Sequence, residues 1–125
     1  LFRRMVFNLV IGNSDDHVKN HGVLHLEGQG WQLAPAFDLV AQVDGHTGYQ
    51  ELAILPGRHV SSLAWARLAA PHFGLQEAEA DRVIDGITTL VVSALPEMVE
   101  AHGGNAPLAA RFTEFVRRQA DRIRA

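Results

Sequence analysis

The stretch that decides the fold of this chain runs from residue 11 to residue 22 and reads Ile11-Gly12-Asn13-Ser14-Asp15-Asp16-His17-Val18-Lys19-Asn20-His21-Gly22. Residues 2–11, directly before the polar part, are apolar on most of the faces that a helix presents, which predicts a buried helix. Gly12 followed by Asn13 is a natural end for that helix. Residues 13–20 carry no repeating apolar period, so we expect a polar loop there.

A β-hairpin is expected after this loop. Two short runs, 21–26 and 30–34, flank the turn that contains Gly28 and Gly30, and two such runs around a Gly-x-Gly turn are typical of a hairpin. Pro35 should end the second strand, because proline has no N–H to contribute to a strand ladder.

The segment from residue 36 to residue 60 has no regular apolar period, because glycine and proline interrupt it. We expect a long loop there, with one short strand at 51–55. Ser61 or Ser62 can then cap a helix that extends to about residue 72.

Two further helices are expected after Gly74. The first opens at residue 76, with early acidic residues, and its apolar residues recur at three- and four-residue steps from 83 to 98. Pro96 should kink or divide this helix. Pro107 begins the last helix. The sequence therefore predicts a single domain over 1–125 that is mainly α with one small β-hairpin.

Composition excludes several classes of protein. The chain has 125 residues, of which 47% are hydrophobic and 20% charged, so it can bury a core and is not a disordered tail. It has no cysteine, which excludes disulfides and thiolate metal sites, and its net charge of −3 argues against direct nucleic-acid binding. The apolar stretch 87–95 is about half of the ~20 residues that span a bilayer. We therefore expect a cytoplasmic protein without a membrane partner.

The polar loop carries side chains suited to phosphate transfer. That reaction needs a carboxylate that accepts the proton of the attacking hydroxyl, and an asparagine and a second carboxylate that hold Mg²⁺. Protein kinases place the catalytic aspartate five residues before the asparagine. Asp15 lies five residues before Asn20, whereas Asp16 lies only four before it. The spacing selects Asp15 as the catalytic group and Asn20 as a metal ligand, with Asp38 as the second ligand.

Two motifs together resemble one family, the HipA-like serine/threonine kinases of bacterial toxin–antitoxin systems. The stretch 11–22 resembles the family's catalytic loop. The second motif resembles its metal-binding segment and reads Trp31-Gln32-Leu33-Ala34-Pro35-Ala36-Phe37-Asp38-Leu39. The resemblance covers about the first 40 residues.

The resemblance implies a set of site residues, cofactors and partners. Asp15 would be the catalytic base, Asn20 and Asp38 would bind Mg²⁺, and His17 and Lys19 would lie beside the phosphates of ATP. The family also implies phosphorylation of a serine or threonine of a protein substrate, growth arrest as the outcome, and a small DNA-binding antitoxin, HipB-like, as a partner.

The resemblance further implies the C-terminal helical lobe of a kinase-like fold: 1–40 would hold the catalytic loop, hairpin and metal segment, 41–60 an activation-segment-like loop, and 61–125 a helical bundle. A kinase also needs a glycine-rich phosphate loop and a strand lysine. Neither is present, since the only lysine, Lys19, is inside the catalytic loop. Because the chain begins at Leu1 rather than Met, we expect the catalytic part of a longer kinase whose N-terminal nucleotide-binding lobe is missing here, and we expect little activity from the chain alone.

Other interpretations remain open at this point. The loop could be a capping turn, in which Asn, Ser and Asp are common. His17, His21 and His25 lie at four-residue spacing and could suggest zinc, but no His-Glu-x-x-His pattern accompanies them. The acceptor could instead be a small molecule or a phosphoinositide. Finally, the helical half, whose last helix carries several arginines, could be a non-catalytic interaction module.

Overall fold

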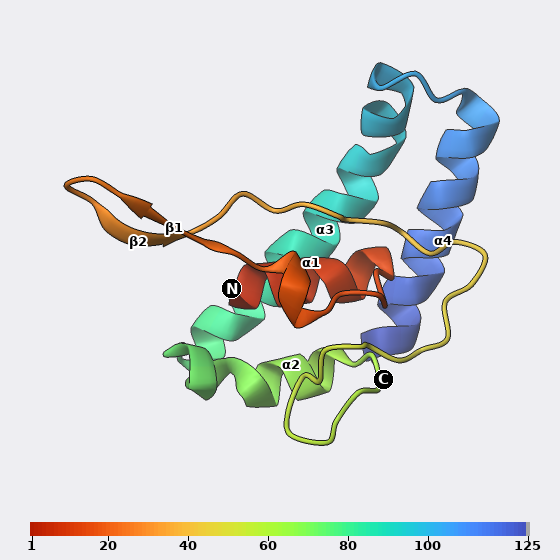
Figure 1. Cartoon of the computed structure of the whole chain (residues 1–125). Coiled ribbons are helices and arrows are strands. Elements are labelled where there is room, and N and C mark those ends of the chain that lie inside the picture. The colour runs from red at the N-terminus through yellow and green to blue at the C-terminus, as the bar shows by residue number, and fades with distance from the viewer. Residues whose placement is uncertain (125) are drawn as a thin grey trace.

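The computed structural model describes residues 1–124, which form four α-helices, two short 3-10 helices and one two-stranded hairpin (Figure 1). In chain order these are α1 (Phe2–Ile11), a 3-10 helix (Val18–Asn20), β1 (Val23–Leu26), β2 (Gly30–Leu33), α2 (Leu63–Ala69), a second 3-10 helix (Ala70–Phe73), α3 (Glu77–Ala101) and α4 (Ala106–Arg124). The prediction of a mainly helical fold with one small hairpin is confirmed.

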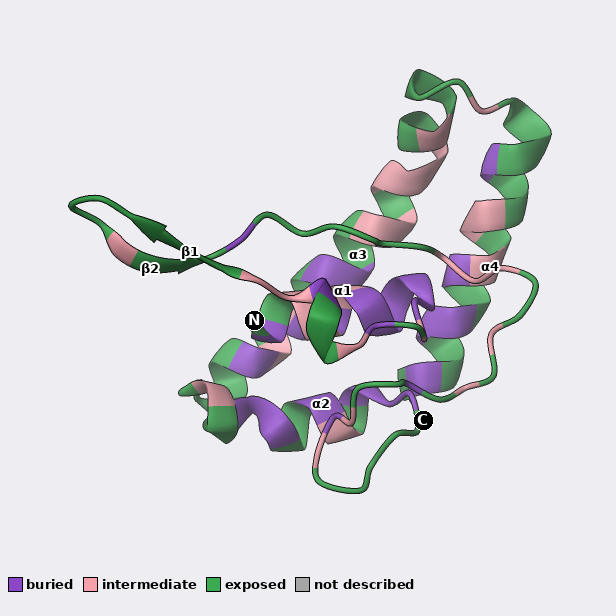
Figure 2. Ribbon diagram, in the orientation of Figure 1, coloured by how far each residue is buried: buried purple, intermediate pink, exposed green. Residues whose placement is uncertain are grey.

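Helix α1 lies at the centre of the molecule. It packs against α2, α3 and α4, and its residues are among the most buried of the chain (Figure 2). Val6, Leu9 and Val10 are fully buried, and each such side chain stabilises the fold by roughly 1.5–3 kcal/mol relative to exposure. The buried helix that the apolar residues predicted is therefore present.

Helix α1 ends where the sequence predicted, at Gly12, which has a left-handed φ of 69°. The N–H of Gly12 donates to the carbonyl of Leu9, and that of Asn13 donates to the carbonyl of Asn8 at 2.9 Å. The buried side chain of Asn13 also donates to Asn8 Oδ1 at 3.1 Å. These bonds satisfy carbonyls at the end of α1 and turn the chain sharply into the polar loop.

The helices after residue 60 follow the prediction with two differences. Ser62 is the cap of α2, since its hydroxyl accepts the N–H of Trp65 at 3.3 Å, but the predicted helix becomes a 3-10 helix from Ala70. Pro96 does not divide α3, which continues to Ala101. Packing of α3 along α4, with Leu95 against the core, outweighs the one backbone N–H that proline lacks.

The strand predicted at 51–55 is wrong. Only two isolated bridges form in this region, Tyr49 with Val60 and Leu55 with Arg58. The backbone N–H groups of Glu51 and Leu52 instead donate to the polar loop that follows α1, so they cannot join a ladder. The long segment between the hairpin and α2 crosses the molecule to α4 before it returns toward α2 (Figure 1).

The hairpin extends away from the helices (Figure 1). Its strands are antiparallel, with Val23 opposite Leu33 and Leu26 opposite Gly30, and Pro35 lies beyond the end of β2 as predicted. Apolar residues are exposed on both strands, and Trp31 is 72% exposed. No helix within residues 1–124 is long and apolar enough to cross a membrane.

We predict that Gly12→Ala destabilises the protein by about 2–4 kcal/mol, because a side chain in the left-handed region is strained and here it also meets other atoms. A Cβ at this position would lie 2.7 Å from Phe115 Cζ and 2.9 Å from His46 Cδ2. Gly28 has a similar φ of 75° with no atom within 4 Å of such a Cβ, so Gly28→Ala isolates the backbone cost. Urea unfolding should show a clearly larger loss for Gly12→Ala; equal losses would contradict the predicted contact.

Candidate active site

The polar loop after α1 is held by backbone hydrogen bonds from a distant part of the chain. The carbonyl of Ser14 accepts the N–H of Glu51, and that of Asp16 accepts the N–H of Leu52, both at 2.9 Å. The N–H of Gln42 donates to the carbonyl of Gly12 at 3.3 Å. The loop is therefore fixed to α1 at its start and to the long segment through its first half, up to Asp16.

Asp15, the predicted catalytic group, lies between the two anchored residues with its side chain exposed. Its carboxylate forms no ion pair or hydrogen bond with any residue of 1–124. A surface pocket of about 320 Å³ opens at this position and is lined by Ser14, Asp15, Gln42, Thr47, Tyr49 and Glu51, among others. The carboxylate is thus free to meet a hydroxyl that enters from solvent.

Asn20 ends the first 3-10 helix and is buried. Its Nδ2 donates to the backbone carbonyl of Asp15 at 3.3 Å, so the structure brings together the two residues that the five-residue spacing selected. Its Oδ1 accepts no hydrogen bond from the described part of the chain. An amide oxygen without a protein partner is a suitable ligand for a hard cation.

Asp38, the predicted second ligand, lies at the end of the segment that leaves the hairpin. It is exposed and has a φ of 55°, a left-handed conformation that aspartate tolerates better than most residues. No ion pair or hydrogen bond within 1–124 engages its carboxylate, and no hydrogen bond joins it to Asp15 or Asn20. Its carboxylate and the amide oxygen of Asn20 are both oxygen donors of the kind that Mg²⁺ binds, and that ion usually keeps several waters and phosphate oxygens as its other ligands.

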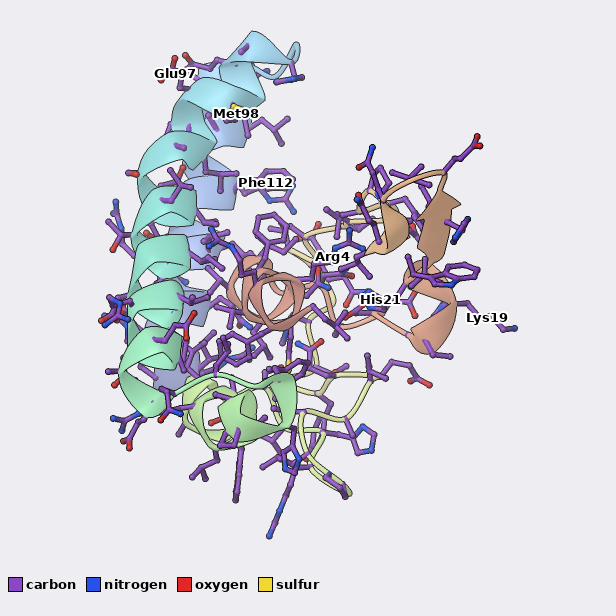
Figure 3. The ribbon with its side chains drawn as sticks, turned by 90° about the vertical axis from the view of Figure 1, so that its left-hand side faces the viewer. Arg4, Lys19, His21, Glu97, Met98 and Phe112 are labelled. Carbon is purple, nitrogen blue, oxygen red and sulfur yellow. The ribbon has the colours of Figure 1, made fainter. Side chains whose placement is uncertain are left out.

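His17 and Lys19 differ in their surroundings. Lys19 extends into solvent and has no acidic partner among residues 1–124, so its charge is available to an anion (Figure 3). His17 is partly buried, and its Nδ1 is buried without a hydrogen-bond partner in the described chain. The structure does not bring His17, His21 and His25 together as a zinc site, and no group of three His, Asp or Glu residues within 1–124 could hold a metal ion.

The loop also contains a pair that the sequence pattern does not indicate, between buried Asp16 and partly buried His21. Asp16 is 6% exposed, and its Oδ1 lies 2.7 Å from Nε2 of His21, which must carry a proton because a carboxylate only accepts. The spacing argument treated Asp16 only as an alternative to Asp15. Two acidic residues in succession, of which only one can face solvent, were a possible sign that Asp16 is buried. A loop has no repeating spacing, however, that would identify His21 as its partner.

The base of the hairpin is tied to α1. The N–H of Ala34 donates to the carbonyl of Gly22 at 2.8 Å, and the guanidinium of Arg4 donates to the carbonyl of Ala34. The polar loop and the hairpin both lie on the side of α1 that faces away from α3 (Figure 3). Arg4 is therefore a residue of α1 that positions the segment leading to Asp38.

Comparison with known proteins shows the family of this chain. The sequence model of the family described as "HipA-like C-terminal domain" matches residues 1–95, which include α1, the loop, the hairpin, α2 and most of α3. The chain belongs to this HipA-like family.

Two relatives of the HipA-like domain come from Sinorhizobium fredii. The chain described here is 25% identical over 114 residues to a protein named "Putative kinase Y4dM", and this match covers 91% of the chain and 28% of that relative. It is 38% identical over 56 residues to "Putative kinase Y4mE", covering 45% of the chain and 13% of that relative. The matched regions therefore cover less than a third of the length of either relative. No solved structure matches it.

His46 connects the long segment to α4 beside the end of α1. Its Nδ1 accepts the N–H of Gly48 at 2.9 Å and a hydrogen bond from Arg122 at 2.7 Å. Burial, and secondly the positive charge of Arg122, lower the pKa of His46 below its ordinary value of 6.5. As the pH falls through 6.5, the imidazole therefore binds a proton in the unfolded chain while it stays neutral in the folded protein.

We predict that this histidine makes the protein less stable as the pH falls below about 6.5, because the unfolded state then binds a proton that the folded state refuses. Replacement by glutamine removes that titration. The melting temperature should fall less between pH 7.5 and pH 5.5 in His46→Gln than in the wild type. The same substitution at an exposed histidine, His72→Gln, is the matched control. Parallel curves for wild type and His46→Gln would show that the prediction is wrong.

Proposed function

We propose that this chain is the catalytic lobe of a HipA-like kinase that transfers the γ-phosphate of ATP to a serine or threonine of a protein substrate. The observation that carries the proposal is the loop in which Asn20 hydrogen-bonds the backbone of Asp15, while Asp15 is exposed and lines a surface pocket. Membership of the HipA-like family supports it. The toxin role, the DNA-binding antitoxin partner and action in the cytoplasm belong to the same proposal.

In the proposed reaction Asp15 orients the acceptor hydroxyl and accepts its proton. The hydroxyl oxygen bonds to the γ-phosphorus, the bond from that phosphorus to the β,γ-bridging oxygen breaks, and ADP leaves. Asn20 and Asp38 would hold Mg²⁺, which supplies stabilisation of the negative charge on the phosphates. The exposed ammonium of Lys19 and the unpaired buried Nδ1 of His17 are the groups of the loop that can meet phosphate oxygens.

The nucleotide needs a second lobe, for which the hairpin offers a surface. An isolated two-stranded hairpin is marginally stable in water, and here apolar side chains stand exposed on both strands and on the segment after them. They are Val23, Leu24, Leu26, Trp31, Leu33, Phe37, Leu39 and Val40. Exposed apolar residues gathered on one arm are typical of a contact surface. We infer that the upstream lobe covers this arm and that ATP binds between the two.

We predict that Asp15→Asn and Asp38→Asn, made in the full-length kinase, each reduce phosphate transfer by about 10²–10⁴-fold, because one removes the proton acceptor and the other a metal ligand. Transfer from Mg-ATP to casein or myelin basic protein measures it, and the same variants should relieve growth arrest on expression.

Glu97→Gln serves as the matched control for these two variants. This carboxylate is exposed near the far end of α3, away from the loop (Figure 3). It should retain full activity and toxicity. If Asp15→Asn also retains them, the chain is a non-catalytic module and the proposal fails.

We predict that residues 1–125 alone transfer phosphate at least about 100-fold more slowly than the full-length protein, since binding and positioning of ATP would be lost with the upstream lobe. Trp31→Ser in the full-length protein should weaken the contact between the hairpin and the upstream lobe. It should therefore slow phosphate transfer, by less than removal of that lobe does. Activity assays of the two proteins at equal concentration decide this. Comparable activity of the isolated chain would show that it needs no second lobe.

A further inference from the structure

We propose that Asp16 and His21 are positioning residues of the phosphate transfer, a proposal that rests on the proposed function. Their buried pair closes the catalytic loop and thereby holds Asn20 against Asp15. Neither side chain is assigned a part in the proton transfer or in metal binding.

The pair joins the two ends of the segment that carries the chemistry. Asp16 directly follows Asp15, and His21 directly follows Asn20, so their contact at 2.7 Å brackets the 3-10 helix Val18–Asn20. A hydrogen bond at this distance to a charged acceptor is among the stronger ones in proteins. The pair therefore fixes the separation between Asp15 and Asn20, each of which lies next to one of its members.

The other hydrogen bonds of the loop are longer, lie within the 3-10 helix, as from Asn20 N–H to the carbonyl of His17 at 2.9 Å, or join the loop to other segments. The bond from Asn20 Nδ2 to the carbonyl of Asp15 is 3.3 Å long, beyond the usual range for N–H···O. The bonds from Glu51 and Leu52 hold only the first half of the loop, through the carbonyls of Ser14 and Asp16. The Asp16–His21 pair is the strong link between this anchored half and the half that contains Asn20.

The surroundings of the pair increase its effect. Asp16 and His21 line a mostly apolar cavity of about 70 Å³ together with Met5, Leu9, Ile54 and Phe73. His21 lies between the 3-10 helix and α1 (Figure 3). Polar groups in such surroundings interact strongly when paired, and the loss of one partner leaves the other buried without compensation. Removal of either side chain should therefore shift the loop rather than leave it in place.

The experiment compares Asp16→Ala, His21→Ala, their double variant and the conservative Asp16→Asn in the full-length kinase. Asparagine keeps an oxygen that accepts from His21 Nε2. We expect each alanine variant to lose about 100-fold in kcat toward casein, the cost of a misplacement of about 1 Å, with the KM for casein changed less than threefold. The double variant should lose no more than either single one, and Asp16→Asn should recover most of the loss.

A second readout does not depend on turnover. Electron paramagnetic resonance of Mn²⁺ in the presence of AMPPNP measures metal affinity directly, and it should fall about tenfold in the alanine variants but not in Asp16→Asn. Asp81→Ala is the matched control, because it breaks an exposed pair with Arg67 at 2.8 Å on the other side of the fold. His21→Leu, which keeps the volume of the side chain, replaces any alanine variant that lacks a cooperative thermal transition.

The outcomes separate this proposal from the proposed function. If Asp15→Asn abolishes transfer while the alanine variants keep both wild-type kcat and Mn²⁺ affinity, the kinase stands and the positioning role is overturned. A uniform loss in which Asp16→Asn is as poor as Asp16→Ala also overturns it. If the wild type transfers no phosphate, the proposed function fails, and unchanged Mn²⁺ affinity across the variants then refutes the positioning role as well.

Discussion

The enclosure of α1 is the constraint on which the rest of the structure depends. Helices α2, α3 and α4 all pack on it, and Gln119 of α4 donates a buried hydrogen bond to the carbonyl of Leu9 at 2.9 Å, within its last turn. The helix end therefore cannot move without disturbing the core. Gly12 then sets the direction of the chain, because its backbone is left-handed and Phe115 and His46 leave no room for a side chain there. The polar loop that carries Asp15 and Asn20 begins at that point.

The loop gains its second support from a segment that is remote in sequence. Gln42, Glu51 and Leu52 donate backbone hydrogen bonds to it, and His46 fastens the same segment to α4 through Arg122. Backbone hydrogen bonds and the Asp16–His21 pair hold the loop in place, while the side chains of Asp15 and Lys19 remain exposed. A loop tied in this way can present reactive side chains with the precision that a site on a helix or strand would have.

Local patterns predicted the parts of the fold that depend on neighbours in sequence. The buried helix that ends at Gly12, the hairpin around Gly28 and the Ser62 cap were all available from residues close together in the chain. The spacing of Asp15 and Asn20 was available in the same way. The sequence could not predict that 51–55 forms no strand, or that Asp16 pairs with His21. Each depends on a contact with a segment that is remote in sequence or irregular. The spacing of apolar residues along the sequence gives no information about contacts between residues of a loop.

The two predicted metal ligands differ in how the fold supports them. Asn20 lies in the loop that α1 and the long segment hold from both sides. Asp38 follows a hairpin that is attached at its base, through Arg4 and Gly22, and is exposed along the rest of its length. Its left-handed φ of 55° has no hydrogen bond or ion pair of its side chain to compensate for it within residues 1–124. On the proposed function, a lobe that covers the exposed arm would supply that missing support, so nucleotide binding and completion of the ligand set would depend on the same contact.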